Sequence, residues 1–377
     1  MRYLDRDTLK ERIEKRANED VSSGRVGGIA LSVHQNGETV YENFFGSASL
    51  TEQIPITDGS VFRIASMTKP VTAVAALILA EKGLLALSDP VEKYLPFFSR
   101  LPLVKLEEGK LVSCGIAKGK PTVLNILTHT SGIGGGKIGS IQYRTMSGEE
   151  KADLHKAVEF HARAGVQFEP SSEVLYSGTP AFDVLAAVIE KVSGKAFGDF
   201  LKENIFDPLS MTDTCFDPSP EQWARMIEMH DYVGGKAASG QTYDGCVFED
   251  IPTSHPLGGA GLVSTLRDYS RFAEMLLNGG MGVITPQSVK LMSTPHVPHA
   301  RQPKSRRWGL GVKVVTDEMG ESLPIGAYSW CGAYGTHFWV DSENRITAIY
   351  LKNSQYDGGG GSVTGTNFER DVTLSLK

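Results

Sequence analysis

The stretch that decides the fold runs from Phe62 to Gly83 and reads "FRIASMTKPVTAVAALILAEKG". A small polar cluster, Ser66 to Lys69, stands directly before a long apolar run. Pro70 has no backbone N–H and is tolerated only in the first turn of a helix, so the sequence predicts a helix that begins close to Ser66. The following run "VTAVAALILA" is apolar almost all round, which indicates a helix buried between two layers.

Two interpretations of Ser66 and Lys69 stay open on these grounds. Ser66 lies at the N-terminal end of the helix, where free N–H groups and the helix dipole favour negative charge, and Lys69 lies on the same face. The pair could be a nucleophile and its base, because a neutral lysine can deprotonate a serine hydroxyl. Alternatively, Ser66 caps the helix and Lys69 is a solvated lysine. A lysine in the first turn opposes the dipole, which weakens the second interpretation.

The bulk composition indicates a globular protein and excludes some partners. The 377 residues are 41% hydrophobic and 22% charged, which suits two domains or one large domain with an insertion. The net charge of −6, without a dense basic stripe, indicates no nucleic-acid partner. The charged N-terminal segment and the shortness of the apolar runs predict no membrane span and a cytoplasmic location. Four scattered cysteines are expected to be free thiols: Cys114, Cys215, Cys246 and Cys331.

The order of predicted elements indicates an α/β domain together with an all-α region. Residues 5–20 form an amphipathic pattern, and Asn36-Gly37 predicts a hairpin turn between strands at 29–34 and 39–46. Helical stretches and long glycine-rich loops follow up to residue 250. The last third predicts strands and a closing helix, at 308–315, 325–331, 336–341, 345–353 and 367–377. This order predicts one antiparallel sheet built from both ends of the chain, flanked by helices, with a helical domain inserted.

Two motifs point to cofactors or metals but lack the context that such sites need. "GGGKIG" at 134–139 matches a dinucleotide-binding spacing, yet a helix and a loop are expected before it instead of a strand, so a surface loop is predicted. "HVPH" at 296–299 has no nearby cysteine or carboxylate and is also expected to be a surface loop. We therefore expect no cofactor and no metal.

Six segments in order resemble the serine β-lactamase-like superfamily. They are "FRIASMTKPVTAVAALILAEKGLLALSDPVEKYLP" (62–96), "ILTHTSGI" (126–133), "VLYSGTPAFDVLAAVIEKVSG" (174–194), "IFDPLSMTDT" (205–214), "GGAGLVSTLRDYSRFAEMLLNGG" (258–280) and "WGLGVKV" (308–314). The resemblance covers about residues 8–376. It includes class C β-lactamases, acyltransferases and D-amino-acid peptidases, and the family VIII carboxylesterases are the most similar in look.

The resemblance implies a fold of the β-lactamase and penicillin-binding-protein type, with the active site in a cleft between two domains. The expected α/β domain is discontinuous, at 1–85 and 251–377, and the expected helical domain covers 86–250. Loops at 133–150 and 230–257 are expected to frame the cleft. Whether the protein is a monomer or a dimer stays open.

The resemblance also implies the site residues. The family's nucleophile falls on Ser66, its lysine on Lys69 and the tyrosine of its second motif on Tyr176. The oxyanion of the reaction is expected between the backbone N–H groups of Ser66 and Ala333. Three further residues are expected to contact substrate: Gly178, Trp330 and Gly332.

The departures from the β-lactamase motifs favour neutral esters. Gly178 stands where β-lactamases carry an asparagine, and Trp330 stands where they carry a lysine that supports the substrate carboxylate. The expected function is therefore a serine carboxylesterase that forms an acyl-enzyme on small ester substrates. Acyltransferase, D-amino-acid peptidase and β-lactamase activity on the same fold remain alternatives, and a non-catalytic binding protein is a remote one. His129 is expected to organise its loop, and Cys331 to pack away from the site.

Overall fold

The computed structural model describes residues 1–239, 255–302, 304–317, 321–354 and 356–377. The strands are β1 (Gly28–Gln35), β2 (Glu38–Ser49), β3 (Ile54–Pro55), β4 (Phe62–Arg63), β5 (Pro102–Glu107), β6 (Lys110–Ile116), β7 (His230–Val233), β8 (Lys236–Ser239), β9 (Val263–Ser264), β10 (Arg306–Trp308), β11 (Lys313–Val315), β12 (Tyr328–Cys331), β13 (His337–Asp341) and β14 (Ile346–Leu351).

The α-helices are α1 (Arg6–Ser22), α2 (Thr68–Glu81), α3 (Val123–Leu127), α4 (Gly136–Thr145), α5 (Gly148–Ala152), α6 (Leu154–Ala164), α7 (Pro180–Ser193), α8 (Phe197–Leu201), α9 (Pro220–Trp223), α10 (Leu266–Leu277), α11 (Pro286–Met292) and α12 (Val363–Thr373). Shorter turns of 3₁₀-helix are η1 (Ala65–Met67), η2 (Val91–Lys93) and η3 (Pro96–Ser99), and η4 (Lys202–Phe206) is a π-helical turn.

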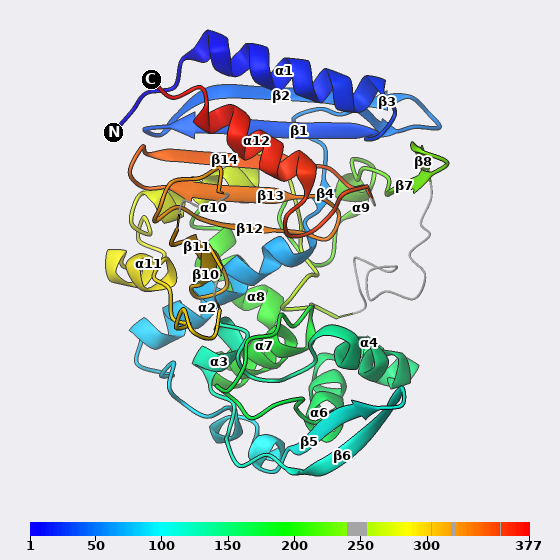
Figure 1. Cartoon of the computed structure of the whole chain (residues 1–377), viewed down its shortest axis with the longest axis vertical. Helices are drawn as coiled ribbons and strands as arrows, with labels where there is room; N and C mark the ends of the chain where they lie inside the picture. The colour runs from blue at the N-terminus through cyan, green and yellow to red at the C-terminus, as the bar shows by residue number, and fades with distance from the viewer. Residues whose placement is uncertain (240–254, 303, 318–320, 355) are drawn as a thin grey trace.

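One large antiparallel sheet is built from both ends of the chain (Figure 1). Its strand order is β10-β11-β12-β13-β14-β1-β2-β3, so β1 pairs with β14, for example at Ala30 and Leu351. The predicted turn connects β1 to β2, and its residues Asn36 and Gly37 both have positive φ, as a type I′ hairpin turn requires. The expected sheet, with helices encoded between its two halves, is confirmed.

Helices cover both faces of this sheet (Figure 1). Side chains alternate along a strand, so neighbouring residues of β13 enter different layers. Trp339 packs in a cluster with residues of α1 and α12, whereas Phe338 packs in the larger cluster with residues of α2 and α10. Every residue of α2 from Thr68 to Leu79 is buried, which confirms the helix that its apolar sequence predicts.

The structure corrects the expected strand at 308–315, which is divided into β10 and β11. The chain turns between them, and the N–H of Gly309 donates to the carbonyl of Val312 at 2.9 Å. Gly311 has a φ of 71°, and a Cβ there would lie 2.9 Å from the Cβ of Ala73 on α2. Because this turn approaches α2 so closely, position 311 requires glycine. The turn interrupts the expected strand.

The structure also corrects the expected loop at 133–150, because most of this segment is helical. Helix α4 begins inside the "GGGKIG" motif, and α5 begins after Ser147. Ser147 and Glu150 form a reciprocal capping box, which stabilises the start of α5. The other expected loop, 230–257, begins with the β7–β8 hairpin, and its residues 240–254 lie outside the described residues.

The region between α2 and α10 contains most of the remaining helices, together with the β5–β6 hairpin (Figure 1). Its main helix, α7, is buried from Pro180 to Ile189 and packs against α2 in the larger core cluster. The expected domain boundaries near residues 86 and 250 stay a prediction.

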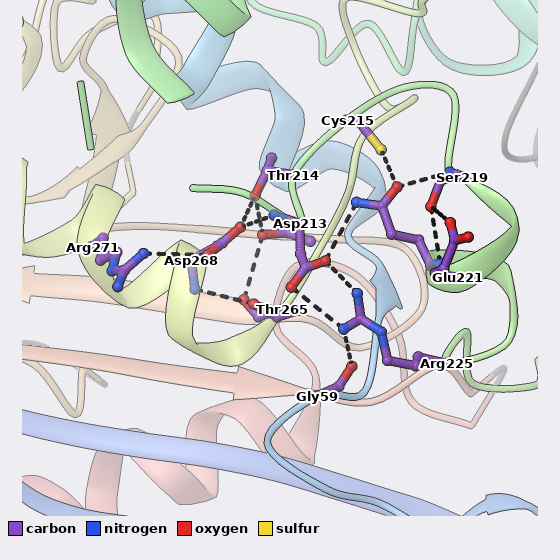
Figure 2. A network of polar contacts seen from close by, with 12 residues as sticks. Gly59, Asp213, Thr214, Cys215, Ser219, Glu221, Arg225, Thr265, Asp268 and Arg271 are labelled. Atoms are coloured by element: carbon purple, nitrogen blue, oxygen red, sulfur yellow. Dashed lines mark hydrogen bonds and ion pairs between the residues drawn. The ribbon is translucent and has the colours of Figure 1, made fainter. Parts of the chain in front are cut away.

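A buried polar network connects this region to the sheet side of the molecule (Figure 2). Asp268 on α10 accepts hydrogen bonds from the N–H of Asp213 at 2.7 Å and from the hydroxyl of Thr214 at 3.1 Å. Arg225 pairs with Asp213 and donates to the carbonyl of Gly59 at 2.6 Å. The network therefore connects α10, the segment before α9 and the loop before β4. This loop lies a few residues before Ser66 in the sequence.

Candidate active site

Ser66 lies in η1, directly before α2, as the position of Pro70 predicts. Ala65 has a φ of 45°, a left-handed conformation that is strained for a residue with a side chain. The turn is held by the Thr68 hydroxyl, which donates to the Ala65 carbonyl at 2.7 Å, and by the Tyr269 hydroxyl, which donates to the Met67 carbonyl at 2.8 Å. Strained backbone that surrounding contacts fix in place is typical of functional sites.

The structure brings Ser66, Lys69 and Tyr176 together by their reactive atoms. The side-chain nitrogen of Lys69 lies 3.2 Å from Ser66 Oγ, and the Tyr176 hydroxyl donates to Ser66 Oγ at 2.7 Å. Met67 occupies the cap position of α2, and no side chain caps it. The alternative in which Ser66 caps the helix is therefore not seen, because its oxygen faces the lysine and the tyrosine.

Lys69 is fully buried and bonded to backbone carbonyls instead of carboxylates. Its amine donates to the carbonyl of Gly259 at 2.7 Å and to the carbonyl of Gly178. Burial lowers the pKa of Lys69 to about 7, although the charge of Asp183 acts in the opposite direction. At neutral pH a substantial fraction of this amine is therefore uncharged and able to accept a proton.

Asp183 is a residue of this site that the sequence interpretation missed. It lies on α7 with 2% exposure, its carboxylate lies beside the N–H groups of Gly258 and Gly259, and its Oδ1 has no hydrogen-bond partner among the described residues. Burial raises the pKa of Asp183 to about 7, whereas Lys69 and these N–H groups lower it. A single carboxylate inside the apolar run "PAFDVLAAVI" was the available signal.

His129 fixes the backbone on both sides of Tyr176. Its carbonyl accepts from the N–H of Leu175 at 2.9 Å, and its Nδ1 accepts from the N–H of Ser177 at 3.1 Å. Burial lowers the pKa of His129 well below its usual range, so the ring is neutral. The predicted organising role of His129 agrees with these contacts.

Aromatic rings surround the phenol of Tyr176. The Trp308 ring lies parallel to it, with centroids 6.1 Å apart, and the Trp330 ring lies at 5.3 Å. Burial raises the pKa of Tyr176 above its usual range, so the hydroxyl stays protonated at neutral pH. Trp308 was not among the residues expected in the site.

The end of β12 approaches the turn that carries Ser66. A Cβ on Gly332 would lie 2.4 Å from the carbonyl oxygen of Ile64, so only glycine fits there. The following Ala333 packs beside Ala65, and its N–H makes no hydrogen bond within the described part of the chain. Trp330 is 7% exposed, and its Nε1 likewise has no partner among the described residues.

Metal and thiol chemistry find little support in the described chain. No group of three or more potential metal ligands occurs in the described residues, and "HVPH" lies in the irregular segment between α11 and β10. Burial raises the pKa of Cys331 to about 11, so its thiol stays protonated. Cys114 and Cys215 are also free, and Cys246 lies outside the described residues. None of the described helices has the length and apolarity to cross a membrane, and the cytoplasmic location stays a prediction.

Comparison with known proteins agrees with this geometry. Protein Rv1367c of Mycobacterium tuberculosis (strain ATCC 25618 / H37Rv) is 30% identical over 362 residues, which covers 87% of this chain and 86% of that protein. Esterase EstB of Burkholderia gladioli is 28% identical over 386 residues and covers 96% of this chain and 94% of its own. The solved structure of EstCE1, described as a hydrolase with promiscuous acyltransferase activity, has a TM-score of 0.83 at 23% identity over 98% of this chain and 99% of that one.

The Beta-lactamase family model matches residues 9–367, a range that contains every residue of the site described above. The chain therefore belongs to the Beta-lactamase family.

Proposed function

We propose that this protein is a serine carboxylesterase that acts through an acyl-enzyme on small ester substrates. The observation that carries the proposal is the contact of Ser66 Oγ with both the Lys69 amine and the Tyr176 hydroxyl. The similarity to Esterase EstB over nearly the whole chain supports ester hydrolysis in particular.

The first step uses Ser66 as nucleophile and Lys69 as base. A neutral Lys69 amine accepts the hydroxyl proton of Ser66 while Ser66 Oγ attacks the ester carbonyl carbon. Tyr176 is not the first base, because its buried phenol is still protonated and donates to Ser66 Oγ. The carbonyl oxygen becomes an oxyanion, which the N–H groups of Ser66 and Ala333 would bind. A preorganised donor of this kind contributes about 3–4 kcal/mol to transition-state stabilisation.

The second step releases the alcohol and then the acid. Tyr176 donates its proton to the departing alkoxide oxygen, and the proton that Lys69 took from Ser66 then returns to the phenolate of Tyr176. Water then attacks the acyl carbon, loses a proton to the same pair of groups, and frees Ser66 as the acid leaves. The burial of Lys69 strengthens these interactions by excluding solvent.

The substrate side of the site supports esters over β-lactams. Gly178 offers its carbonyl to Lys69 but no side-chain donor to a substrate amide. Trp330 brings an apolar ring next to Tyr176 at the position where the resemblance places a lysine in β-lactamases. Gly332 lets the backbone pass close to the turn that carries Ser66, and substrate is expected to lie along Gly178, Trp330 and Gly332.

Acyl transfer is the second candidate, because an alcohol or amine could replace water in the second step. The described acyltransferase activity of EstCE1, a structural neighbour, favours it over D-amino-acid peptidase or β-lactamase activity. A non-catalytic binding role requires the loss of a reactive group, whereas Ser66, Lys69 and Tyr176 are all present.

Hydrolysis of 4-nitrophenyl butyrate by the purified protein tests the proposal. Ser66→Ala should abolish turnover without changing the circular dichroism spectrum, and Lys69→Ala and Tyr176→Phe should each reduce kcat by several orders of magnitude. A fluorophosphonate should label Ser66, as mass spectrometry of the digested protein would show. Full activity in Ser66→Ala, or labelling of another residue, would refute the assignment. Comparison with a D-alanyl peptide, a cephalosporin and an added alcohol separates the alternative activities.

A further inference from the structure

Lys313 on β11 is a half-buried lysine with no assigned partner. Its amine makes no hydrogen bond and no ion pair within the described residues. It lies 5.2 Å from the centre of the Trp308 ring and 5.8 Å from the centre of the Trp330 ring. Trp330 in turn contacts the Tyr176 ring at 5.3 Å, so a single tryptophan separates this amine from the candidate catalytic tyrosine.

The amine borders a pocket of about 370 Å³ on the other side of Trp330. The pocket is also lined by Arg306, Cys331 and the glycine-rich segment around Gly360. A Cβ on Gly360 would lie 3.6 Å from the sulfur of Cys331, so the absence of side chains in this segment keeps the pocket open. The pocket and the candidate active site therefore share Trp330 as a common wall.

The other charges of this pocket are already paired. Arg306 donates to Glu369 at 2.7 Å and to Glu321 at 2.5 Å, and His337 lies 2.8 Å from the same Glu369. Lys304 is exposed at the pocket and adds a second positive charge. Lys313 therefore makes no ion pair among the described residues, although the charge of Glu321 acts on it, and the lining of the pocket carries three Lys and Arg side chains against two Glu carboxylates.

Strand pairing leaves space between Lys313 and the site. β11 pairs with β12 only at Ser329 and Tyr328, so Trp330 and Cys331 have no neighbouring strand on that side. In our proposal, the far end of a substrate bound at Ser66 lies beyond Trp330, along this unpaired edge. It would then reach the pocket and the Lys313 amine.

Packing on the two tryptophan rings is the alternative explanation of Lys313. A cation on an aromatic face gains less than an ammonium loses in hydration when it is buried without a partner. Burial lowers the pKa of Lys313, whereas the charges of Cys331 and Glu321 act in the opposite direction. A carboxylate in the pocket would supply the missing charge.

We propose that Lys313 binds a carboxylate carried by the ester substrate, in the pocket beyond Trp330. This inference rests on the proposed esterase function and adds a substrate class to it, namely half-esters and other esters with an acidic end. Trp330 alone leads us to expect neutral esters. With Lys313 on the neighbouring strand β11, the protein still accepts neutral esters but prefers esters that carry a carboxylate.

Two esters of equal shape test the role of Lys313. 4-Nitrophenyl hydrogen glutarate carries a carboxylate where 4-nitrophenyl 5-methylhexanoate carries an isopropyl group. Lys313→Met should reduce the ratio of kcat/KM for the acidic over the neutral ester by about ten- to hundredfold. Lys313→Arg should retain most of the ratio. Lys290→Met removes one exposed positive charge outside the pocket, and it should leave the ratio as in the native protein.

The outcomes separate a binding role from a structural one. If Lys313 only packs on the tryptophans, Lys313→Met lowers both rates equally, and an unchanged ratio overturns the proposal. If the native protein hydrolyses neither ester, the proposed esterase function is refuted. Binding of free glutarate then tests the carboxylate site at Lys313 independently of any hydrolysis. Glutarate should raise the melting temperature of the native protein but not that of Lys313→Met. An equal shift in both proteins, or none in either, would overturn the binding site.

Discussion

The amine of Lys69 lies 2.7 Å from the carbonyl oxygen of Gly259, and the N–H of the same Gly259 lies beside the carboxylate of Asp183. One glycine thus connects the candidate base to a buried acid on α7. Thr72 on α2 donates to the adjacent carbonyl of Gly258 at 2.7 Å, so this segment is fixed from both helices. The connection makes the charge state of Lys69 depend on Asp183, with consequences for activity that can be measured.

The activity of the native protein should rise with pH through about 7. Burial lowers the pKa of Lys69 to about 7, so the amine is protonated and inactive as a base below that pH and neutral above it. The measurement is kcat/KM for 4-nitrophenyl butyrate between about pH 5 and 9. Because Lys69 and Asp183 are coupled, the profile reports an apparent pKa of the pair. A profile that is flat across this range would contradict the role of Lys69 as base.

Asp183→Asn should move this rise to lower pH. The negative charge of Asp183 raises the pKa of Lys69, so its removal lowers that pKa further. An asparagine oxygen can still accept from Gly258 and Gly259, so the backbone geometry is retained. Asp183→Leu removes both the charge and the acceptor, and it should also reduce kcat. An unshifted profile in Asp183→Asn would show that Asp183 is only structural.

Substitution of His129 should impair Tyr176 without removing any reactive group. His129→Leu loses the Nδ1 acceptor for the N–H of Ser177, so Tyr176 is less well positioned, and kcat should fall by about ten- to hundredfold. His129→Asn is the matched control, because its oxygen can replace Nδ1 and asparagine tolerates the φ of 55° at this position. The Asn variant should retain more activity than the Leu variant; the reverse order would contradict this account.

Gly178→Asn should fold normally and improve the use of substrates that carry an amide next to the scissile bond. A Cβ at this position meets nothing within 4 Å, so the side chain fits without displacement. The new side chain restores the donor that the resemblance places here in β-lactamases. The ratio of cephalosporin to 4-nitrophenyl butyrate hydrolysis should rise, with Gly178→Ala as the control. A fall in melting temperature for Gly178→Ala would show that the site is not open.

Asp268→Ala should destabilise the protein by about 1–3 kcal/mol, since the N–H of Asp213 and the hydroxyl of Thr214 lose their buried acceptor (Figure 2). The free energy of unfolding in urea measures the effect. Asp207→Ala is the matched control, because Asp207 pairs with Lys202 at the surface, where such a pair contributes about 0–1 kcal/mol. Equal losses in the two variants would contradict a special role for the network.

The sequence predicts the parts of this molecule that depend on local rules. Pro70 places the start of the helix, and therefore Ser66, because a missing N–H is tolerated only in a first turn. Asn36-Gly37 predicts its hairpin because both residues adopt positive φ readily. The resemblance places Tyr176, whose contact with Ser66 joins residues 110 positions apart. Local sequence alone contains no sign of that contact.

The features that the sequence did not predict arise from approaches between distant segments. Gly311 interrupts an apparently continuous strand because its backbone passes Ala73 on α2, which no pattern in residues 308–315 indicates. Asp183 is recognisable as unusual in an apolar helix, but its partners Gly258 and Gly259 come from a later segment. Lys313 looks like an ordinary strand lysine until β12 places Trp330 beside it.

The pairing of β1 with β14 has a consequence for the synthesis of the protein. β1 finds β2 at once, but its other edge has no partner until residues 346–351 have left the ribosome. An unpaired edge of this kind is prone to aggregation, so the nascent chain is vulnerable from the synthesis of β1 until that of β14. The same pairing brings the chain ends together, where the N–H of Lys377 donates to the carbonyl of Tyr3 at 2.9 Å. A circular permutant joined there and opened at the exposed turn residue Gly109 would have β14 made shortly before β1, so the two central strands would follow each other in synthesis.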